Sequence, residues 1–455
     1  MYQKDYHIHF VGIGGIGMSG IAELLINLGY KVSGSDLKLS HITKRLEKKG
    51  GIIFQGHTKE QVTSANVVVT STAIAKENPE VIQAKALSIP IIPRAEMLAE
   101  LMRIKYSIAV SGAHGKTSTT AMISQILNTA GLDPTVVIGG LLQGLDTNAL
   151  HGKGDFIVAE ADESDGSFLK YSPAIAAVTN IDLEHLDFYK DIEDIKDKFV
   201  QFINSVPFYG LAILCLDNEH VQNILPRIMV RYTTFGMTAQ SDLQAKEIAL
   251  KGSKSYFKVV HHEKTLGEIN LNIAGKHNIS NALASIATAI ELKIDFKTIK
   301  KALESIKGVQ RRLEIKGEKK QILVMDDYGH HPTEILATLA AVRESYKDKR
   351  LIVVFQPHRY TRTKGLFHEF TRAFYQCDIL IVLPIYAASE QEIEGVNSQQ
   401  LCKGIEEHGH KDVSYAPDFT QALSMITHKV KKNDVVLTLG AGDIYTLGEE
   451  LVEIL

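Results

Sequence analysis

A short glycine turn ending in Gly-Lys-Thr has the residues needed to bind a phosphate. It lies between residues 107–111, an apolar run that predicts a buried strand, and residues 117–128, an amphipathic run that predicts a helix. The N–H groups of such a turn bind phosphate, the lysine reaches the β- and γ-phosphates, and the threonine hydroxyl binds Mg²⁺. The candidate nucleotide ligands are Gly112, Ala113, His114, Gly115, Lys116, Thr117 and Ser118.

This turn departs from the full phosphate-loop pattern, because Val110 stands where that pattern has its first glycine. The match is therefore to the shorter form G-x-x-G-K-T. A plain strand-to-helix turn with a surface lysine is the alternative. The predicted strand before the turn and the predicted helix after it favour the phosphate loop.

Two acidic runs follow the next two predicted strands of the same segment. Residues 160–165 read EADESD, and residues 180–187 read NIDLEHLD. Ligands bind at the carboxyl ends of strands in open α/β sheets, and Mg²⁺ prefers oxygen ligands. One acidic run alone is more often a solvated loop, but two of them beside a phosphate loop predict a metal–nucleotide site.

A second glycine turn, with the spacing G-x-G-x-x-G, follows the predicted strand of residues 7–11. Its glycines are Gly12, Gly14 and Gly17, and Asp36 stands about 20 residues further on, as in dinucleotide-binding folds. The physics requires only a pyrophosphate at a helix N-terminus and a sugar hydroxyl nearby. A UDP-sugar therefore fits as well as NAD, and a purely structural glycine turn is a further alternative.

Three later segments carry polar residues at the ends of predicted elements. His277 and Asn281 lie four residues apart at a helix start, where they are either caps or ligands. Residues 326–332, DDYGHHP, follow a strand; adjacent residues rarely converge on one ion, so they favour a ribose or substrate contact over a metal site. Arg359 and Arg362 suit a carboxylate or a phosphate, with a solvated surface pair as the alternative.

Short β-branched runs alternate with longer helical patterns, which predicts parallel sheets covered by helices. Boundaries near residues 105 and 313 divide the chain into domains 1–105, 106–313 and 314–455. The fold class is α/β, with N- and C-terminal Rossmann-like parallel sheets flanking a central P-loop ATPase-like α/β domain. Residues 232–273 are hairpin-like and predict a small antiparallel appendage.

Composition narrows the classes of function. The chain has 455 residues, too many for one core, and its net charge of −3 argues against nucleic acid or an anionic membrane as a partner. Three scattered cysteines fit a reducing compartment, and neither a signal peptide nor a membrane helix is evident. We expect a cytoplasmic enzyme whose oligomeric state stays open.

In their order along essentially the whole chain, these motifs resemble those of the Mur ligase family. The segments that carry the resemblance are Gly12–Gly20, Gly112–Thr117, Glu160–Phe168, Asn180–Asp187, Gly275–Ala284, Asp326–Glu334, Gln356–Thr363 and Gly440–Ile444. The resemblance implies three domains, which bind a UDP-sugar, ATP, and ATP together with an amino acid. It implies that the carboxylate of UDP-N-acetylmuramate is phosphorylated by ATP and that the amine of L-alanine then attacks the acyl phosphate, in peptidoglycan precursor synthesis.

The resemblance also assigns roles to individual residues. Those implied to be catalytic are Lys116, Glu160, His185 and Arg359; Thr117 and Glu160 would bind one Mg²⁺, and His185 a second. His277, Asn281 and Arg312 would contact ATP together with residues 112–118, and Asp326 or Asp327 its ribose. The UDP-sugar residues would be Gly12, Gly14, Gly15, Gly17, Met18, Ser19, Asp36, Ser71 and Arg94. Arg359, Arg362 and His330 would contact the amino acid or the acyl phosphate.

Three other functions are weighed against this one. A ligase that adds an intact tripeptide to the same UDP-sugar is the nearest, and the GIGGIGMSG form of the first loop favours the alanine reaction over it. An NAD-dependent dehydrogenase leaves the phosphate loop and both acidic runs unexplained. A nucleotide switch would hydrolyse ATP without ligating anything.

Overall fold

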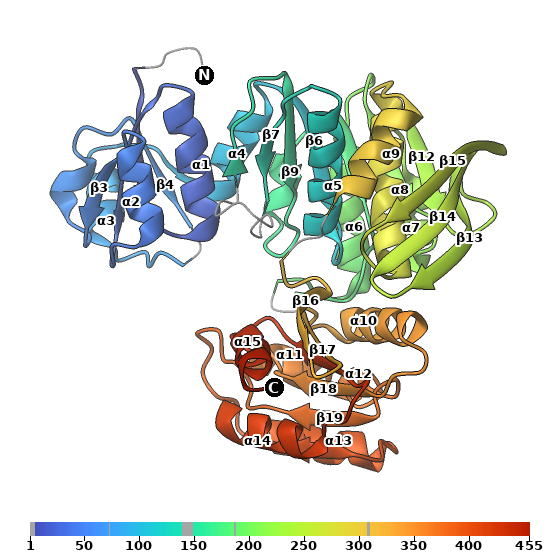
Figure 1. Cartoon of the computed structure of the whole chain (residues 1–455). Helices are drawn as coiled ribbons and strands as arrows, with labels where there is room; N and C mark the ends of the chain where they lie inside the picture. Colours follow the sequence, from blue (N-terminus) through green and yellow to red (C-terminus); the bar gives the residue numbers. More distant parts are fainter. Residues whose placement is uncertain (1–4, 72, 139–148, 186–187, 307–309) are drawn as a thin grey trace. The chain divides into compact units, whose positions relative to one another are not determined.

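The computed structural model describes residues 5–71, 73–138, 149–185, 188–306 and 310–455. The chain folds as three successive α/β domains, each built on its own sheet (Figure 1). This is the predicted fold class. The predicted domain boundaries at residues 105 and 313 stay predictions.

The N-terminal sheet is parallel throughout, in the order β3-β2-β1-β4-β5. Its strands are β1 (His7–Val11), β2 (Lys31–Asp36), β3 (Ile52–Gln55), β4 (Val67–Thr70) and β5 (Ile91–Pro93). The helical segments are α1 (Ile16–Asn27), α2 (His41–Lys48), η1 (Lys59–Val62), α3 (Pro79–Ala86) and α4 (Arg94–Met102). The strand order reverses beside β1, so the loop after β1 lies at the switch point where such sheets bind ligands.

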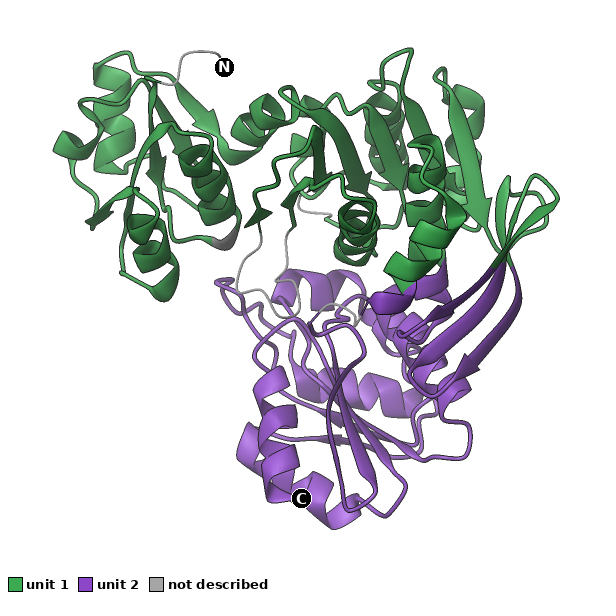
Figure 2. Cartoon of the chain, turned by 45° about the horizontal axis from the view of Figure 1, so that its top comes forward, with its two compact units in different colours: residues 1–245, 259–267, 280–303 green, residues 246–258, 268–279, 304–455 purple. Residues whose placement is uncertain are grey.

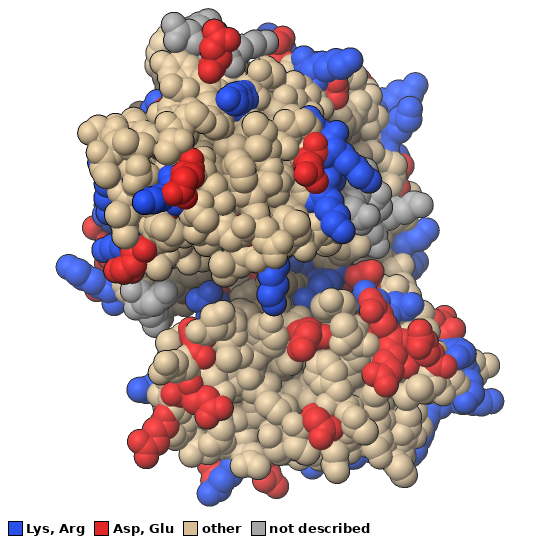
Figure 3. All heavy atoms as spheres, turned by 90° about the vertical axis from the view of Figure 1, so that its left-hand side faces the viewer, with Lys and Arg blue, Asp and Glu red and all other residues tan. Residues whose placement is uncertain are grey.

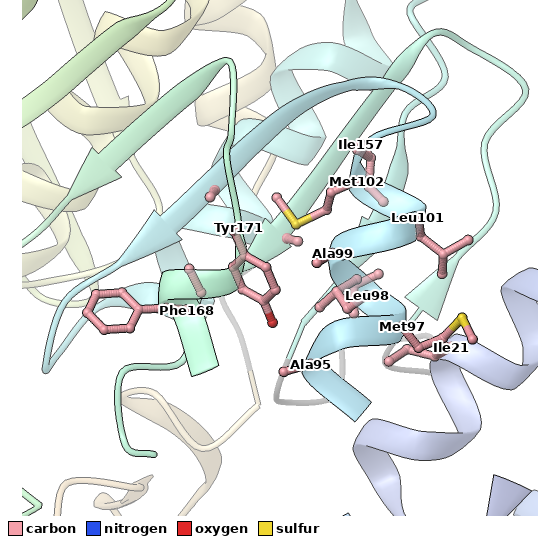
Figure 4. Packing of buried hydrophobic residues seen from close by; sticks show 14 of the residues in the cluster. Ile21, Ala95, Met97, Leu98, Ala99, Leu101, Met102, Ile157, Phe168 and Tyr171 are labelled. Carbon is pink, nitrogen blue, oxygen red and sulfur yellow. The ribbon is translucent and has the colours of Figure 1, made fainter. Parts of the chain in front are cut away.

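Helix α4 joins the N-terminal sheet to the central one through apolar packing. Met97 of α4 lies near Ile21 of α1, while the other side of α4 faces Phe168, Tyr171 and Ile157 of the central segment (Figure 4). All of these side chains belong to one continuous buried cluster. The glycine loop after β1 and the phosphate loop after β6 (Tyr106–Ser111) are therefore built on one shared core.

The central sheet runs β15-β14-β13-β12-β11-β10-β6-β9-β7-β8. Besides β6, its strands are β7 (Thr135–Val137), β8 (Ala149–Leu150), β9 (Phe156–Glu160), β10 (Ile175–Val178), β11 (Leu211–Cys215), β12 (Tyr232–Gly236), β13 (Leu243–Lys251), β14 (Lys254–His261) and β15 (Lys264–Leu271). The helical segments are α5 (Lys116–Thr129), η2 (Ser167–Lys170), α6 (Ile192–Ile203), α7 (Glu219–Ile224), η3 (Leu225–Arg227), α8 (Lys276–Glu291) and α9 (Phe296–Ser305).

The predicted appendage of residues 232–273 differs from the observed arrangement. Strand β12 pairs in parallel with both β11 and β13, and the strands through β15 extend the central sheet. Asp242 makes the short β12–β13 connection possible, because its carboxylate accepts the backbone N–H of Thr234 at 2.8 Å. Only the two-residue connections on either side of β14 have the length of antiparallel hairpins.

The C-terminal sheet runs β16-β17-β21-β18-β19-β20 and is parallel except for its edge strand β16. Its strands are β16 (Glu314–Lys319), β17 (Ile322–Asp327), β18 (Leu351–Phe355), β19 (Ile379–Val382), β20 (Val413–Tyr415) and β21 (Val435–Leu439). Its helices are α10 (Pro332–Ser345), α11 (Tyr360–Gly365), α12 (Phe367–Phe370), α13 (Ser398–Glu407), α14 (Phe419–Lys429) and α15 (Tyr445–Ile454). Lys320 and Gln321 both have positive φ, which matches the tight turn of a two-residue hairpin.

By compactness the chain divides into two units, residues 1–245, 259–267 and 280–303, and residues 246–258, 268–279 and 304–455 (Figure 2). In the described residues, no helix is both long and apolar enough to span a membrane. Figure 3 shows both acidic and basic side chains on the face that it draws, and the small net charge of −3 means that their numbers nearly balance over the whole chain.

Candidate nucleotide and substrate sites

The phosphate loop follows β6 and leads directly into α5, as predicted. Gly112 has φ +135°, and a Cβ there would lie 2.2 Å from the Oγ1 of Thr179 and 2.9 Å from the carbonyl oxygen of Asn180. Both neighbours belong to the segment that follows β10, the strand paired with β6. Only glycine has the backbone freedom and the small size that this position requires.

The strand neighbouring the loop also fixes its conformation through hydrogen bonds. The Asn180 side chain accepts the backbone N–H of His114 at 2.9 Å and donates to the His114 carbonyl at 2.9 Å. Thr179 donates to the same carbonyl at 2.6 Å. From α8, Asn281 lies against Gly115, where a Cβ would come 2.5 Å from its Oδ1. The loop is therefore held before any ligand arrives.

Lys116, the first residue of α5, points its ammonium group back across the loop. Its Nζ donates to the carbonyl oxygen of Gly112 at 2.6 Å and to both carboxylate oxygens of Glu163 at 2.9 Å. Burial lowers the pKa of Lys116, but the carboxylates of Glu163, Asp162 and Glu184 raise it above its ordinary value. Lys116 is therefore a fixed positive charge in the phosphate loop.

A candidate metal group lies beside this lysine. One ligand atom from each of Glu163, Glu184 and His185 lies within 4.8 Å of the others. The two acids are buried, and His185 has φ +56°, a conformation that few non-glycine residues adopt. Two carboxylates provide the oxygen ligands that Mg²⁺ prefers, so the donor set fits that ion.

The predicted metal residues Thr117 and Glu160 lie at the same edge of the sheet. Thr117 is the second residue of α5, and Glu160 ends β9 opposite Val110 of β6. Glu163 and Glu184 were not among the predicted ligands, although both stand in the two acidic runs that predicted the site. Leu186 and Asp187, which close the second run, lie outside the described residues.

The first glycine loop is held by the end of β2. The carbonyl oxygen of Ser35 accepts the N–H of Gly12 at 2.8 Å and that of Ile13 at 3.0 Å, and the Asp36 carboxylate accepts the N–H of Gly14 at 2.9 Å. Asp36, predicted from the sequence to contact a ribose, thus uses one oxygen to shape the loop.

The structure brings Arg94 to this loop as well. A Cβ at Gly17 would lie 2.3 Å from the Nη1 of Arg94, so the guanidinium group lies over the start of α1. Met18 and Ser19 are buried in the first turn of that helix, and Ser71 follows β4, the strand next to β1. Their contacts with a UDP-sugar stay predictions.

The two aspartates at the end of β17 are buried and engaged within their own domain. Asp326 accepts from Thr438 at 2.6 Å and from the Nε of Arg311 at 3.1 Å. Asp327 accepts the N–H groups of Leu313 and Gly329, each at 2.8 Å. Burial raises the pKa of Asp327 to about 6, with Arg312 opposing that rise. Both carboxylates therefore support the loops around them, and their predicted contact with a ribose stays a prediction.

Arg312 and His277 share an environment in the C-terminal unit. The Nη1 of Arg312 lies 3.4 Å from Glu334, and its guanidinium group lies over the ring of Tyr328, 5.2 Å from the centroid. Burial, and then the charge of Arg312, lower the pKa of His277 to about 4. His277 is therefore neutral at pH 7.

A further cluster gathers at the carboxyl ends of β17, β18 and β19. The ring of His358 stacks on Tyr386 at 5.7 Å, and His330 lies 5.7 Å from His358 on another side. Arg362 donates to the Nδ1 of His358 at 3.2 Å, and Arg359 has φ +70°. Burial, followed by the neighbouring His330 and arginine charges, lowers the pKa of His358 to about 3. The cluster therefore combines two permanently charged guanidinium groups, those of Arg359 and Arg362, with the stacked rings of His358 and Tyr386.

His330, Arg359 and Arg362, which were predicted to contact the amino acid or the acyl phosphate, thus lie around the ring of His358. His358 and Tyr386 were not predicted as part of this cluster. His358 stands inside the QPHRYTRT motif, so its position next to Arg359 was a usable signal. The sequence contains no such signal for Tyr386, because this residue follows a different strand. It reaches the site through the backbone bridge between residues 358 and 386.

Family models match three consecutive parts of the chain. They are the Mur ligase family catalytic domain over residues 7–106, the Mur ligase middle domain over 110–289 and the Mur ligase glutamate ligase domain over 311–442. The chain belongs to the Mur ligase family. The resemblance inferred from the motifs is confirmed.

Two relatives similar in sequence over the whole chain carry the same name. A protein of Desulforapulum autotrophicum named UDP-N-acetylmuramate–L-alanine ligase is 72% identical over 100% of both chains, and one of Desulfatibacillum aliphaticivorans with the same name is 59% identical over 99% of both. The crystal structure of UDP-N-acetylmuramate-alanine ligase from Thermotoga maritima matches with a TM-score of 0.81 at 29% identity, covering 98% of each chain. A murein peptide ligase from Psychrobacter arcticus matches with a TM-score of 0.69 at 25% identity, again over 98% of each chain.

Proposed function

We propose that this Mur ligase joins L-alanine to the carboxylate of UDP-N-acetylmuramate at the expense of ATP, in peptidoglycan precursor synthesis. The observation that carries the proposal is the 72% identity, over the whole of both chains, with a relative of that name. We infer further that it acts in the cytoplasm and that neither nucleic acid nor a membrane is its partner.

The first domain binds the UDP part of the substrate. Its loop is preformed by Ser35 and Asp36 of β2, so the N–H groups at the start of α1 are available to a diphosphate with little ordering cost. Arg94 supplies a positive charge at the same place. The remaining predicted contacts, from Gly15, Met18, Ser19 and Ser71, complete the proposed subsite.

The central domain activates the muramoyl carboxylate. A carboxylate acylates poorly because oxide is a poor leaving group, and phosphorylation makes phosphate the leaving group instead. Phosphoryl transfer depends on charge neutralisation and positioning more than on a protein nucleophile. Lys116 supplies a fixed ammonium at the phosphate loop, and Glu163 keeps it in position. His277, Asn281 and Arg312 are proposed to contact the rest of the nucleotide, with Asp326 and Asp327 beside its ribose.

Mg²⁺ would be held by residues of the central domain. Thr117, Glu160 and His185 are the proposed ligands, and Glu163 and Glu184 extend the set because their carboxylates lie beside His185. A bound Mg²⁺ supplies neutralisation of the charge on the phosphates. The chain's own contribution is to hold these oxygen and nitrogen atoms at the same edge as Lys116.

The C-terminal domain positions the amino acid and the acyl phosphate. Arginine pairs recognise carboxylates and phosphates through paired N–H groups. Arg359 and Arg362 are proposed for that role, with His330 next to them. Because Arg362 can only donate, the Nδ1 of His358 accepts, and the ring proton of His358 lies on Nε2. That proton is available to an acceptor on the substrate.

One assay tests the reaction. The protein is mixed with Mg²⁺-ATP, UDP-N-acetylmuramate and L-alanine, glycine, L-serine or a tripeptide in turn, and phosphate release and product mass are measured. We expect phosphate release that requires both the UDP-sugar and L-alanine, with a product heavier by one alanyl residue. A product that gains a tripeptide would identify the recycling ligase instead. Phosphate release indifferent to the acceptor would point to a nucleotide switch, and nicotinamide turnover to a dehydrogenase.

A further inference from the structure

A continuous chain of hydrogen bonds crosses the buried face of the N-terminal sheet that meets α3. His7 and His9 lie on one face of β1, and the parallel register places Ser33 of β2 opposite His9. The Nε2 of His7 lies 2.7 Å from the Ser33 hydroxyl, which lies 2.7 Å from the Nδ1 of His9. The Nε2 of His9 then lies 3.1 Å from the Oε1 of Glu80 on α3.

The second carboxylate oxygen of Glu80 continues this network. Oε2 accepts from the hydroxyl of Ser35 at 2.6 Å and lies 2.9 Å from the Nδ1 of His57. Glu80 is 0% exposed, and the ion-pair partners that the described residues offer it are His9 and His57 alone. A carboxylate buried without a lysine or arginine is strongly disfavoured as a bare anion.

The same contacts reach the diphosphate loop. The Ser35 side chain is bound by Glu80, while its backbone carbonyl accepts the N–H groups of Gly12 and Ile13. Asp36, the next residue, accepts from Gly14. Ser35 and Asp36 thus accept hydrogen bonds from three consecutive N–H groups of the loop, and the side chain of Ser35 is itself hydrogen-bonded to Glu80.

The direction of the hydrogen bonds sets the number of protons. The Nδ1 of His7 lies 2.9 Å from the carbonyl oxygen of Ser64, and a carbonyl only accepts, so that nitrogen carries hydrogen. If His7 is neutral, its Nε2 accepts from Ser33, whose oxygen then accepts from the Nδ1 of His9. If His9 is also neutral, its Nε2 carries no hydrogen. The contact between this nitrogen and Glu80 is then a hydrogen bond only if Glu80 carries the proton.

Two arrangements satisfy every contact with the same number of protons. In one, His7 is doubly protonated and Glu80 is ionised; in the other, both histidines are neutral with hydrogen on Nδ1 and Glu80 is protonated. They interconvert when three protons each move across one hydrogen bond, from the Nε2 of His7 to Ser33, from Ser33 to the Nδ1 of His9, and from the Nε2 of His9 to Glu80. A third arrangement with the same number of protons, in which His9 is doubly protonated and Glu80 is ionised, also satisfies every contact.

We infer that Glu80 is a positioning residue for the diphosphate-binding loop. In this proposal the chain His7–Ser33–His9–Glu80 also carries one proton more than it would carry if Glu80 were ionised and both histidines were neutral. The inference of a positioning role rests on the proposed function. The extra proton cancels the buried charge of Glu80, so the N–H groups at the start of α1 meet an anionic diphosphate without a buried net negative charge behind the loop. Besides Glu80 itself, the ionisable groups that the described residues place beside this chain are His57 after β3 and Lys31 at the start of β2.

The proton count is tested on the full-length wild-type chain. Long-range ¹H–¹⁵N correlation spectra report which ring nitrogens carry hydrogen, and the His7 signals are assigned by their loss in His7→Gln. We expect the Nδ1 of His7 to be protonated at pH 7. The Ser64 hydroxyl also lies 3.2 Å from this nitrogen and would donate to it if the extra proton were absent. A bare Nδ1 on His7 therefore overturns the proton count.

The positioning role is tested by Glu80→Gln, which keeps the shape but cannot share the proton. We expect the Kd for UDP-N-acetylmuramate and its KM to rise roughly tenfold, with kcat at saturation unchanged. Ser35→Ala should act in the same direction, and Glu80→Asp should recover part of the affinity.

The matched control is Glu23→Gln in α1. Glu23 is also a buried acid of this domain, but it pairs with Arg45 and Lys49 and makes no described contact with the loop. Unchanged UDP-sugar affinity in Glu80→Gln, or an equal loss in both variants, overturns the positioning role. A wild-type chain that binds no UDP-sugar contradicts the proposed function instead, and the spectra still decide the proton count.

Discussion

The two glycine loops of this chain each connect a parallel strand to a helix, but they are supported in different ways. The first loop, residues 12–17, is shaped by the end of β2, through Ser35 and Asp36. The second, residues 112–116, is shaped by the segment after β10, through Thr179 and Asn180, and contains its own ammonium group. Under the proposed function, the first loop and the start of α1 offer N–H groups to a diphosphate that is only bound. The second loop brings a fixed positive charge to a phosphoryl group that is transferred.

The largest expected effect comes from removing the charge of the second loop. Lys116→Met should lower kcat about a thousandfold, because it takes away an electrostatic contact that matters most in the transition state. The Kd for UDP-N-acetylmuramate should stay the same, since that substrate is proposed to bind the first loop. Turnover and calorimetric binding measure the two quantities. A loss of both together would contradict the assignment of separate loops.

Substituting one glycine in each loop should show whether the atoms packed against that loop can move aside, through the loss of stability that each substitution causes. In Gly112→Ala the new Cβ meets the backbone of Asn180 at a positive φ, which we expect to cost about 3 kcal/mol of stability. In Gly17→Ala it meets only the flexible end of Arg94, and we expect a cost of about 1 kcal/mol or less. Thermal unfolding of the two variants beside wild type measures the difference; equal costs would show that both loops are equally constrained.

Asp36→Ala should affect the first loop without affecting the second. The carboxylate accepts the Gly14 N–H, and loss of a charged hydrogen bond of this kind is worth about 2 kcal/mol. We expect a Kd for UDP-N-acetylmuramate raised by roughly thirtyfold and an unchanged KM for ATP. Asp36→Asn, which keeps an acceptor oxygen, is the control and should bind more tightly than the alanine variant. A rise in the KM for ATP would show that the two loops are coupled.

The smallest effect concerns α8, the helix that supports the second loop through Asn281. His277 at its start has a pKa lowered to about 4, so it is neutral in the folded chain at pH 7. As the pH falls below about 6.5, the unfolded chain takes up a proton that the folded chain refuses until about pH 4. Stability should therefore fall between pH 7 and pH 5, by about 1–2 kcal/mol from this group.

Urea unfolding midpoints at pH 7 and pH 5, for wild type and His277→Asn, measure this contribution. The variant should lose less stability than wild type between the two pH values, because asparagine does not titrate. An identical decrease in both proteins would mean that His277 is protonated in the fold and that Arg312 does not repel it.

Local pattern predicted much of the fold. The run at residues 7–11 predicted a strand with the observed bounds of β1, and the run at residues 107–111 predicted β6 to within one residue. Alternating polarity and the positions of glycine act over a few neighbouring residues, so the sequence alone contains the information that specifies such strands and turns. The parallel pairing of β12 with β13 depends on Asp242 binding Thr234 across a turn, and no local pattern contains that contact.

The candidate sites divide in the same way. The sequence by itself determined which residue types stand at which strand ends: Lys116 at the start of a helix, acids after β9 and β10, and arginines after β18. Only the tertiary structure decided which of these side chains meet. It brought Glu163 to Lys116, Tyr386 to His358 and Glu80 to Ser35, pairs separated by 47, 28 and 45 positions along the chain. The physical reason is that a side chain's chemistry is a local property, whereas its partners depend on the order and register in which strands pair.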